Sequence, residues 1–322
     1  MEIGSFLELQ LPKGREFYNQ EADIARLNTG RMGIWHAFRV TECKRIWIPI
    51  YQCDSIRETF EKKDVEMCFY HQDKEWNPLD IDAHEDDAVL LVNYFGIMSS
   101  ERMAGLAKSY KHAIVDCAQA FFCHPVVGAL TVYSCRKFVG VPDGAYVVGK
   151  DAHKFVEEYP QCYSSDTATF LLKRIEYGCE GKSYKARSLN EHRLNTENCM
   201  RMSKLTHTLM DAEDYSYNRQ KRKENFTYVH QQLGGINQIN PTRYMDEETV
   251  PMVYPLVVED DGLIQKLFAA KHFQGHWWSY ICEEQPKDSF EHWMSRYVIP
   301  ITIDQRYGKK EMDYLVNVIK EL

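Results

Sequence analysis

Short apolar runs alternate with amphipathic segments between residues 45 and 149. The apolar runs are rich in β-branched and aromatic residues, and they predict strands at residues 45–50, 66–70, 89–94, 113–116, 130–133 and 145–148. Helical patterns lie between them at 54–62 and 99–110, where Ser99 is a suitable N-cap. Continuously apolar strands that alternate with helices indicate an α/β fold, a mostly parallel central sheet with helices on both faces.

The second half of the chain has a different pattern. After residue 159 it is polar and charged, and we predict one long helix over 198–233, ended by Gly234. A smaller α+β unit follows, with strands expected at 250–258 and 297–303 and helices at 263–271 and 310–322. We therefore expect a large domain with an N-terminal arm over residues 1–210 and a small C-terminal α+β domain over 211–322.

Reactive side chains follow neighbouring predicted strands between residues 112 and 149. Asp116 ends one apolar run, Ser134 ends the next, and Lys137 lies three positions further on. Because the carboxyl ends of parallel strands share one edge of a sheet, these groups should lie together, whereas strand alternation should turn Arg136 to the opposite face. Pyridoxal phosphate (PLP) needs such a set: an amine for its aldehyde, a carboxylate for its pyridine nitrogen, and a phosphate donor.

These residue types in this order, with Gln119 three positions after Asp116, resemble the fold-type I sugar aminotransferases of the DegT/DnrJ/StrS family. The resemblance implies the PLP-transferase fold of type I and PLP as cofactor. It also implies that Asp116 pairs with the pyridine nitrogen and that Gln119 lies beside the cofactor ring. Ser134 would bind the phosphate, and Lys137 would form the Schiff base.

The resemblance covers most of the chain, from Leu27-Asn-Thr-Gly-Arg31 to Ile303-Asp-Gln-Arg-Tyr-Gly308. The sequence departs from the family pattern at one spacing, since Lys137 follows Ser134 by three positions where the family commonly has a longer insertion. The chain is also somewhat short for the family. Neither departure removes the amine that a Schiff base requires.

A second group of candidate cofactor ligands precedes an apolar-periodic helix expected over 32–40. Thr29, Gly30 and Arg31 open this helix. A glycine lets backbone amides approach an anion closely, and the positive end of a helix favours phosphate. The resemblance makes these residues candidates for the phosphate site; without it, a plain helix N-terminus explains them equally well.

Other candidates have a structural alternative. Tyr51 would stack on the cofactor ring or pack as a core aromatic, and Asn93 would hydrogen-bond the cofactor hydroxyl or the substrate. Arg306 would bind a substrate carboxylate or phosphate, or form a structural salt bridge. The aromatic residues His276-Trp277-Trp278 and Trp293 would wall an acceptor pocket, although core or interface packing explains them as well.

Composition limits the partners. The formal net charge of −8 over 322 residues argues against nucleic-acid binding, and the basic run Arg219–Lys223 is expected to be a solvated helix face. Neither a secretion signal nor a membrane span is expected, and the ten cysteines are scattered, as in a cytoplasmic protein with reduced thiols. Cys123-His124 is a weak metal signal, so no metal is expected.

The leading hypothesis is a PLP-dependent aminotransferase that moves an amino group, with glutamate as the expected donor, to a keto sugar that is nucleotide-linked. The resemblance also implies a homodimer, because the family builds its active site at a dimer interface. Two alternatives are another PLP reaction, such as a sugar dehydratase, and a non-catalytic scaffold protein with the same fold. Dehydratases of this type replace the Schiff-base lysine with histidine, so Lys137 argues against them.

Overall fold

The computed structural model describes residues 3–21 and 23–321. Its centre is a sheet of eight strands in the order β1-β8-β7-β6-β5-β2-β3-β4. The run from β7 to β3 is parallel, and the antiparallel pairings lie toward the two sides of the sheet. The strands are β1 (Ile24–Leu27), β2 (Arg45–Pro49), β3 (Glu66–Gln72), β4 (Pro78–Leu79), β5 (Asp87–Val92), β6 (His112–Cys117), β7 (Leu130–Ser134) and β8 (Ala145–Val148).

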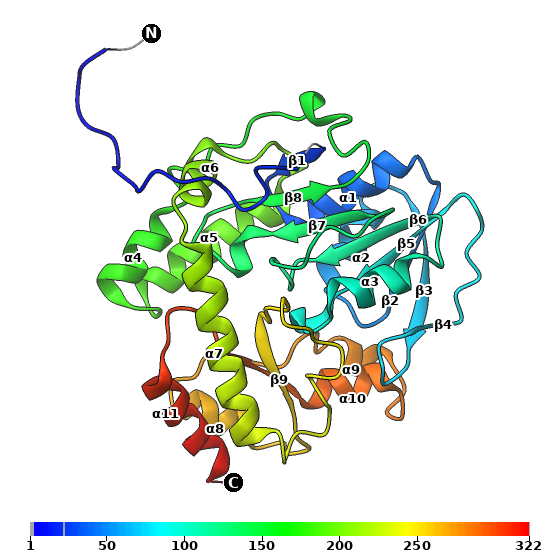
Figure 1. Cartoon of the computed structure of the whole chain (residues 1–322), viewed down its shortest axis with the longest axis vertical. Helices are drawn as coiled ribbons and strands as arrows, with labels where there is room; N and C mark the ends of the chain where they lie inside the picture. Colours follow the sequence, from blue (N-terminus) through cyan, green and yellow to red (C-terminus); the bar gives the residue numbers. More distant parts are fainter. Residues whose placement is uncertain (1–2, 22, 322) are drawn as a thin grey trace.

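Helices cover both faces of this sheet, as predicted (Figure 1). Helices α1 (Gly30–Thr41) and α2 (Asp54–Glu61) contribute to one hydrophobic cluster, and α3 (Ser100–Ala107) contributes to the other. The central strands β5 to β7 are buried along their whole length or nearly so, which explains their continuous apolar sequences. The predicted α/β fold and its strands are thus confirmed, while β1 and β4 are too short to give a sequence signal.

The prediction of one long helix over 198–233 is wrong. The chain forms α6 (Lys204–Asp211) and then α7 (Tyr215–Leu233), with a break at 212–214. Asp214 causes the restart, because its carboxylate accepts a hydrogen bond from the amide of Tyr217 and so caps the second helix. Gly234 is the C-cap of α7, as expected.

Two helices in the polar middle of the chain were not predicted. They are α4 (Thr169–Tyr177) and α5 (Lys182–Thr196), which pack against each other as a hairpin. Helix α5 buries only four residues, two of them polar, so it lacks the apolar stripe by which an amphipathic helix is recognised. The hairpin also leaves Leu172, Ile175 and Leu189 exposed.

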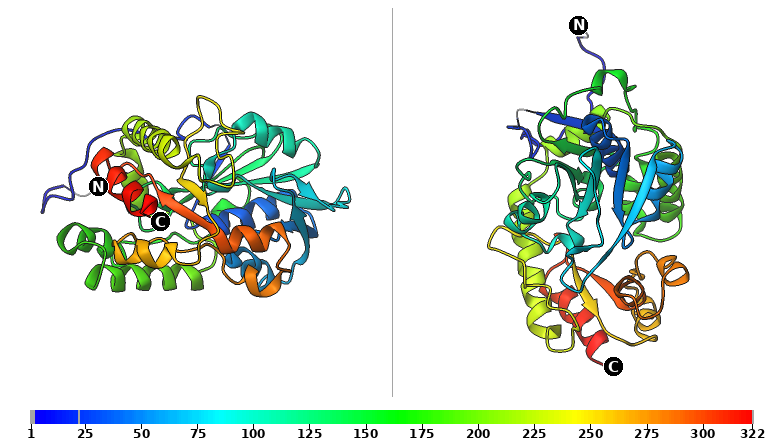
Figure 2. Two further views of the ribbon diagram at one scale, coloured as in Figure 1. Left: turned by 90° about the horizontal axis from the view of Figure 1, so that it is seen from below. Right: turned by 90° about the vertical axis from the view of Figure 1, so that its right-hand side faces the viewer.

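The predicted second unit is present and has an antiparallel pair of strands, β9 (Val253–Val257) and β10 (Val298–Thr302). Its helices are α8 (Leu263–Ala269), α9 (Ile281–Glu284), α10 (Phe290–Tyr297) and α11 (Lys309–Lys320). The described part of the chain begins and ends at opposite ends of the molecule (Figure 2). The domain boundary near residue 210 remains a prediction. In residues 3–21 and 23–321, no helix is both long and apolar enough to cross a membrane.

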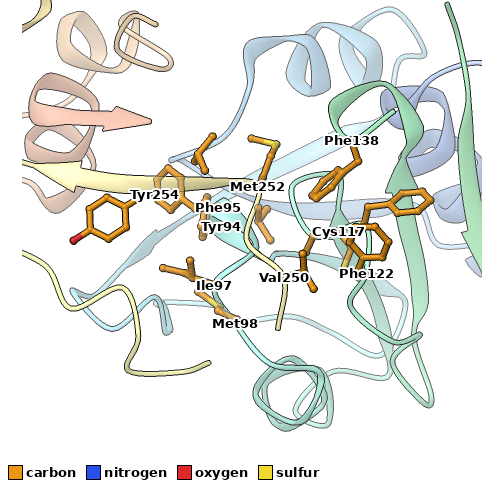
Figure 3. Close-up of a cluster of buried hydrophobic side chains, with 14 of the residues drawn as sticks. Tyr94, Phe95, Ile97, Met98, Cys117, Phe122, Phe138, Val250, Met252 and Tyr254 are labelled. Atoms are coloured by element: carbon orange, nitrogen blue, oxygen red, sulfur yellow. The ribbon is translucent and has the colours of Figure 1, made fainter. Parts of the chain in front are cut away.

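One hydrophobic cluster joins the large sheet to the second unit. It includes Phe95, Phe138 and Met252, which lie close to one another in Figure 3. The amide of Met252 donates a 2.8 Å hydrogen bond to the carbonyl of Phe95. A Cβ at Gly96, whose φ is +72°, would lie 2.3 Å from the carbonyl oxygen of Gln119, so this close approach requires glycine. The second unit is therefore packed directly against the carboxyl edge of the sheet.

Candidate active site

The carboxyl ends of the parallel strands border a large cavity. Strands β6 and β7 run parallel, and Lys137 lies in a short 3-10 turn, η2 (Cys135–Lys137), immediately after β7. The cavity has a volume of about 1320 Å³ and is lined by Gln119, Ser134 and Lys137 from the sheet, by the α4–α5 hairpin, and by the second unit. Of the predicted cofactor residues, Gln119, Ser134 and Lys137 thus line one cavity, whereas Asp116, Thr29, Gly30 and Arg31 are not among its lining residues.

Asp116 is buried at the end of β6. Its carboxylate accepts hydrogen bonds from the amide of Ala118 at 2.8 Å and from the side chain of Gln52 at 3.2 Å. Burial raises the pKa of Asp116, while the positive charge of Lys137 and these hydrogen bonds oppose that rise. Asp116 has no ion-pair partner in the described part of the chain, so a cationic ligand would stabilise its charged form.

Lys137 extends from a rigid backbone into the cavity. Its side chain is exposed and makes no hydrogen bond or ion pair with the described residues. The next peptide is held firmly, because the carbonyl of Phe138 accepts hydrogen bonds from Asn218 at 3.0 Å and from Gln305 at 2.8 Å. The structure therefore offers a free amine on a fixed support.

Arg136 does not point away from the site, contrary to the prediction. It lines the same cavity as Lys137 and forms an ion pair with Glu191 of α5. The reason is that strand alternation ends at Ser134, where β7 passes into the 3-10 turn. Successive side chains in such a turn are not on opposite faces.

The N-terminus of α1 lies beside Ser134. A Cβ placed on Gly30 would be 3.5 Å from the Cβ and 3.9 Å from the Oγ of Ser134. Thr29 is the N-cap, and its side chain accepts a 3.3 Å hydrogen bond from the first turn. The guanidinium of Arg31 donates to Asn195, and burial lowers the pKa of Arg31. Free amides at a helix start, a hydroxyl and a cation are groups that can bind an anion.

The side-chain amide of Gln119 is held by a hydrogen bond to its oxygen, while its nitrogen is free. The side-chain oxygen accepts a 2.7 Å hydrogen bond from the amide of Phe95, and the residue is buried. The nitrogen of the same amide makes no hydrogen bond to a described residue, and Gln119 lines the cavity. The group can therefore donate to a ligand without being reoriented.

Tyr51 and Asn93 lie at the same edge but are not among the residues that line the cavity. The Tyr51 ring is fully buried and meets Trp278 edge-on at 4.6 Å between ring centroids. The Asn93 side chain donates to the carbonyl of Met98 at 2.8 Å and accepts from its amide at 3.2 Å. Tyr51 has the geometry of a core aromatic, and Asn93 fixes its own loop.

Arg306 also lines the cavity, but Asp304 occupies its fork with hydrogen bonds of 2.8 and 2.7 Å. Among the aromatic candidates, Trp277 and Trp278 line the cavity, whereas Trp293 donates to Glu259 at 2.9 Å. The ring of Trp277 is also stacked on a core phenylalanine at 5.4 Å. Trp277 and Trp278 therefore both line the cavity and pack against core aromatic residues.

Two polar residues near the site were not singled out from the sequence. Gln52, the partner of Asp116, directly follows the chosen Tyr51, so the strand-end rule could have included it. Arg222 belongs to the basic run that was expected to be solvated, yet it is only 2% exposed. Its signal was helical spacing, because Arg222 shares a buried stripe of α7 with Phe226 and Val229.

No protein-family model and no curated protein matches the sequence. Solved structures do match. The sugar aminotransferase CalS13 from Micromonospora echinospora has a TM-score of 0.63 and 15% identity over 92% of this chain and 87% of its own. The PMP-form of Spr1654, a sugar aminotransferase from Streptococcus pneumoniae, has a TM-score of 0.65 and 14% identity over 94% and 88%.

The Bacillus subtilis protein NtdA, solved with bound cofactor PMP, has a TM-score of 0.63 and 12% identity over 94% of this chain and 74% of its own. At such identities the likeness concerns the fold. The mixed sheet with its helices and the small antiparallel unit agree with that likeness. The chain therefore has the fold of fold-type I PLP-dependent sugar aminotransferases.

Proposed function

We propose that this protein is a PLP-dependent aminotransferase that moves an amino group from an amino acid, with glutamate as the donor, to a nucleotide-linked keto sugar. One observation carries the proposal: Lys137 places a free amine at the cavity, and it is the cation whose charge acts on the buried carboxylate of Asp116. The fold shared with sugar aminotransferases supports the same reaction.

The residues fit PLP. Asp116 can hold the proton of a pyridine nitrogen, since an opposite charge favours its ionised form despite burial. Ser134 and the amides at the start of α1, where Gly30 lies beside Ser134, would bind the phosphate, with Thr29 and Arg31 as further ligands. When bound, PLP supplies an electron sink for the charge that develops on the substrate carbon.

Lys137 has two proposed tasks. Its amine would hold the cofactor aldehyde covalently, and once released it would take a proton from the α-carbon of the amino donor and deliver it to the former aldehyde carbon of the cofactor, acting as base and then as acid. The exposed and unpaired side chain leaves it free to do both. Gln119 donates from its free nitrogen beside the ring. Tyr51, Asn93 and Arg306 are proposed as further contacts of the cofactor or the substrate.

We propose a homodimer in the cytoplasm. The exposed Leu172, Ile175 and Leu189 of the α4–α5 hairpin support a protein contact next to the cavity, because exposed apolar side chains favour association. The ten cysteines, all free thiols, support a reducing compartment. Light scattering of the purified protein tests the dimer directly.

Spectroscopy tests the proposed function. Protein incubated with PLP should gain an absorbance band near the visible edge that borohydride removes, and Lys137→Ala should not gain it. Glutamate should then release 2-oxoglutarate from the loaded wild type only. Absence of the band would exclude the enzyme in favour of the scaffold alternative. A band without release of 2-oxoglutarate, but with loss of water from a sugar, would favour the dehydratase alternative.

A further inference from the structure

We propose that Arg222 binds the carboxylate of the amino donor and so makes the site specific for amino acids. This inference rests on the proposed function, because it names the group that recognises one of the two substrates. Arg222 lies on α7 and lines the same cavity as Lys137. It was expected to be part of a solvated helix face, and its burial is the first sign of another role.

The guanidinium of Arg222 is held in place from several sides. Its Nε donates to the Asn218 side chain at 2.8 Å, and one terminal nitrogen donates to the carbonyl of Met252 at 2.9 Å. Its carbon lies 4.4 Å from the centre of the Phe138 ring. The other terminal nitrogen, Nη2, makes no hydrogen bond to any residue in the described ranges. A preorganised arginine with a free donor can bind a carboxylate at little entropic cost.

The charge of Arg222 lacks a direct counter-ion. The side chain forms no ion pair with a carboxylate in residues 3–21 and 23–321. Asp304 is the acid that acts on it most, but Arg306 already occupies that carboxylate. Burial lowers the pKa of Arg222 to about 10. A buried cation without a partner is costly, so an anion that enters the cavity gains from pairing with it.

The position of Arg222 suits an amino acid held at Lys137. Phe138 directly follows Lys137 in the chain, its ring contacts Arg222, and its carbonyl is bound by Asn218, one helical turn from Arg222. The amino and carboxylate groups of an α-amino acid are attached to the same carbon. A site that takes the amino group at Lys137 therefore needs a cation nearby to bind the carboxylate. Among the cations that line the cavity, Arg222 is the buried one.

The other four arginines that line the cavity are less suitable. Arg174 and Arg187 belong to the α4–α5 hairpin, where the first is half-buried and the second is exposed. Arg306 is engaged by Asp304, and its side chain is 57% exposed. Arg136 is paired with Glu191. A purely structural role for Arg222 is the main competing explanation, because its hydrogen bond to the carbonyl of Met252 ties α7 to the segment before β9. That role would affect stability without affecting the choice between charged and neutral ligands.

Binding of glutarate to the cofactor-loaded protein tests the inference, with its neutral diamide, glutaramide, as the comparison ligand. Wild type, Arg222→Lys and Arg222→Gln are compared by calorimetry, and Arg219→Gln serves as the control. Arg219 lies one turn earlier on α7 and pairs with Glu248 at the surface, so this control removes the same charge outside the cavity. Thermal unfolding of each variant shows whether it is folded.

We expect Arg222→Gln to weaken glutarate binding by about tenfold or more, the scale of a lost charge-assisted hydrogen bond, and to leave glutaramide binding unchanged. Arg222→Lys should recover part of the loss, and Arg219→Gln should bind as wild type does. Equal glutarate affinity in wild type and Arg222→Gln would overturn the inference, as would equal loss for both ligands. If Arg222→Gln does not fold, the folded Arg222→Lys variant is used instead. Glutarate affinity equal to that of wild type, or an equal loss for glutarate and glutaramide, would then overturn the inference.

The inference and the proposed function fail in different ways. If Lys137 takes up PLP and releases 2-oxoglutarate while Arg222→Gln keeps wild-type affinity for glutarate, only the inference is wrong. If Lys137 takes up no PLP, the proposed function fails, and the same glutarate titration of the unloaded protein still shows whether Arg222 is a carboxylate site. Wild-type affinity there would overturn the carboxylate site as well.

Discussion

At the scale of single residues, the account depends on how burial and charge act on Asp116. Burial raises the pKa of Asp116, and nearby donors and Lys137 counter it. Asp116→Asn keeps the shape but removes the charge that holds a proton on the pyridine nitrogen. We expect turnover to fall by about 100-fold or more, the scale of a lost catalytic electrostatic contact, with a much smaller change in PLP affinity. Steady-state kinetics and PLP titration would measure both; a parallel loss of affinity and turnover would contradict this role.

Gln52 should tune the same carboxylate. Its side chain donates a hydrogen bond of 3.2 Å to the Asp116 carboxylate. A hydrogen bond to the charged form of a carboxyl group lowers its pKa. Gln52→Met should therefore raise the pKa of Asp116 and move the acid limb of the pH–rate profile to higher pH, while activity on the alkaline side is kept. Gln161→Met is a suitable control, since Gln161 bonds the carbonyl of Met202 away from Asp116. An unchanged acid limb would mean that Gln52 does not act on the catalytic step.

The candidate residues were predictable to different degrees. Asp116, Ser134 and Lys137 could be found because each lies at or just after the end of an apolar strand, and strand ends fix position well. The neighbour of Lys137, Arg136, could not, because a 3-10 turn interrupts the alternation there. The burial of Arg222 is indicated by its helical spacing from Phe226 and Val229, but no local pattern contains its hydrogen bond to Met252, 30 positions away in sequence.

At the scale of elements, the close packing of α1 on the sheet positions the proposed phosphate site. A Cβ at Gly33 would lie 2.8 Å from Val132 Cγ1 and 3.4 Å from Val147 Cγ2. Gly33→Ala should therefore lower the free energy of unfolding by about 1–3 kcal/mol through overpacking. Gly105→Ala in α3 is the matched control, because a Cβ there meets nothing within 4 Å. It should stabilise the helix by about 0.5–1 kcal/mol in denaturant unfolding; equal effects would contradict the packing argument.

The elements themselves were predicted where the sequence has a strong apolar period. The buried strands of the central sheet and the helices α1 to α3 follow from such patterns. The α4–α5 hairpin does not, because α5 buries few apolar side chains and is held largely by its neighbour. The break before α7 depends on one capping carboxylate, Asp214, inside a polar stretch where many residues would be compatible with a continuous helix.

At the scale of the whole molecule, Glu16 ties the N-terminal arm to the large sheet. Its buried carboxylate contacts Arg26 of β1, Tyr146 of β8 at 3.0 Å and His207 of α6 at 3.1 Å. Burial by itself raises the pKa of Glu16, but the hydrogen bonds from His207 and Arg26 outweigh it and lower the pKa to about 2. The folded protein therefore prefers the ionised acid more than the unfolded chain does.

This network predicts the response to acid. A depressed folded-state pKa contributes stability above the unfolded value of 4.5, and that contribution is lost as the pH falls toward about 2. Glu16→Gln should lower the free energy of unfolding at pH 7 by roughly 3 kcal/mol and flatten its dependence on pH between these values. Denaturant unfolding at a series of pH values measures both. A variant whose stability declines with acid as steeply as wild type would contradict the role of Glu16.

The most direct measurement of the central claim is peptide mass spectrometry of the protein after incubation with PLP and reduction by borohydride. The account predicts a single pyridoxyl adduct on the peptide that contains Lys137, and loss of that adduct in Lys137→Ala. An adduct on a different lysine, or an unmodified Lys137 in folded protein, would contradict the assignment of the amine and with it the proposed chemistry of the site.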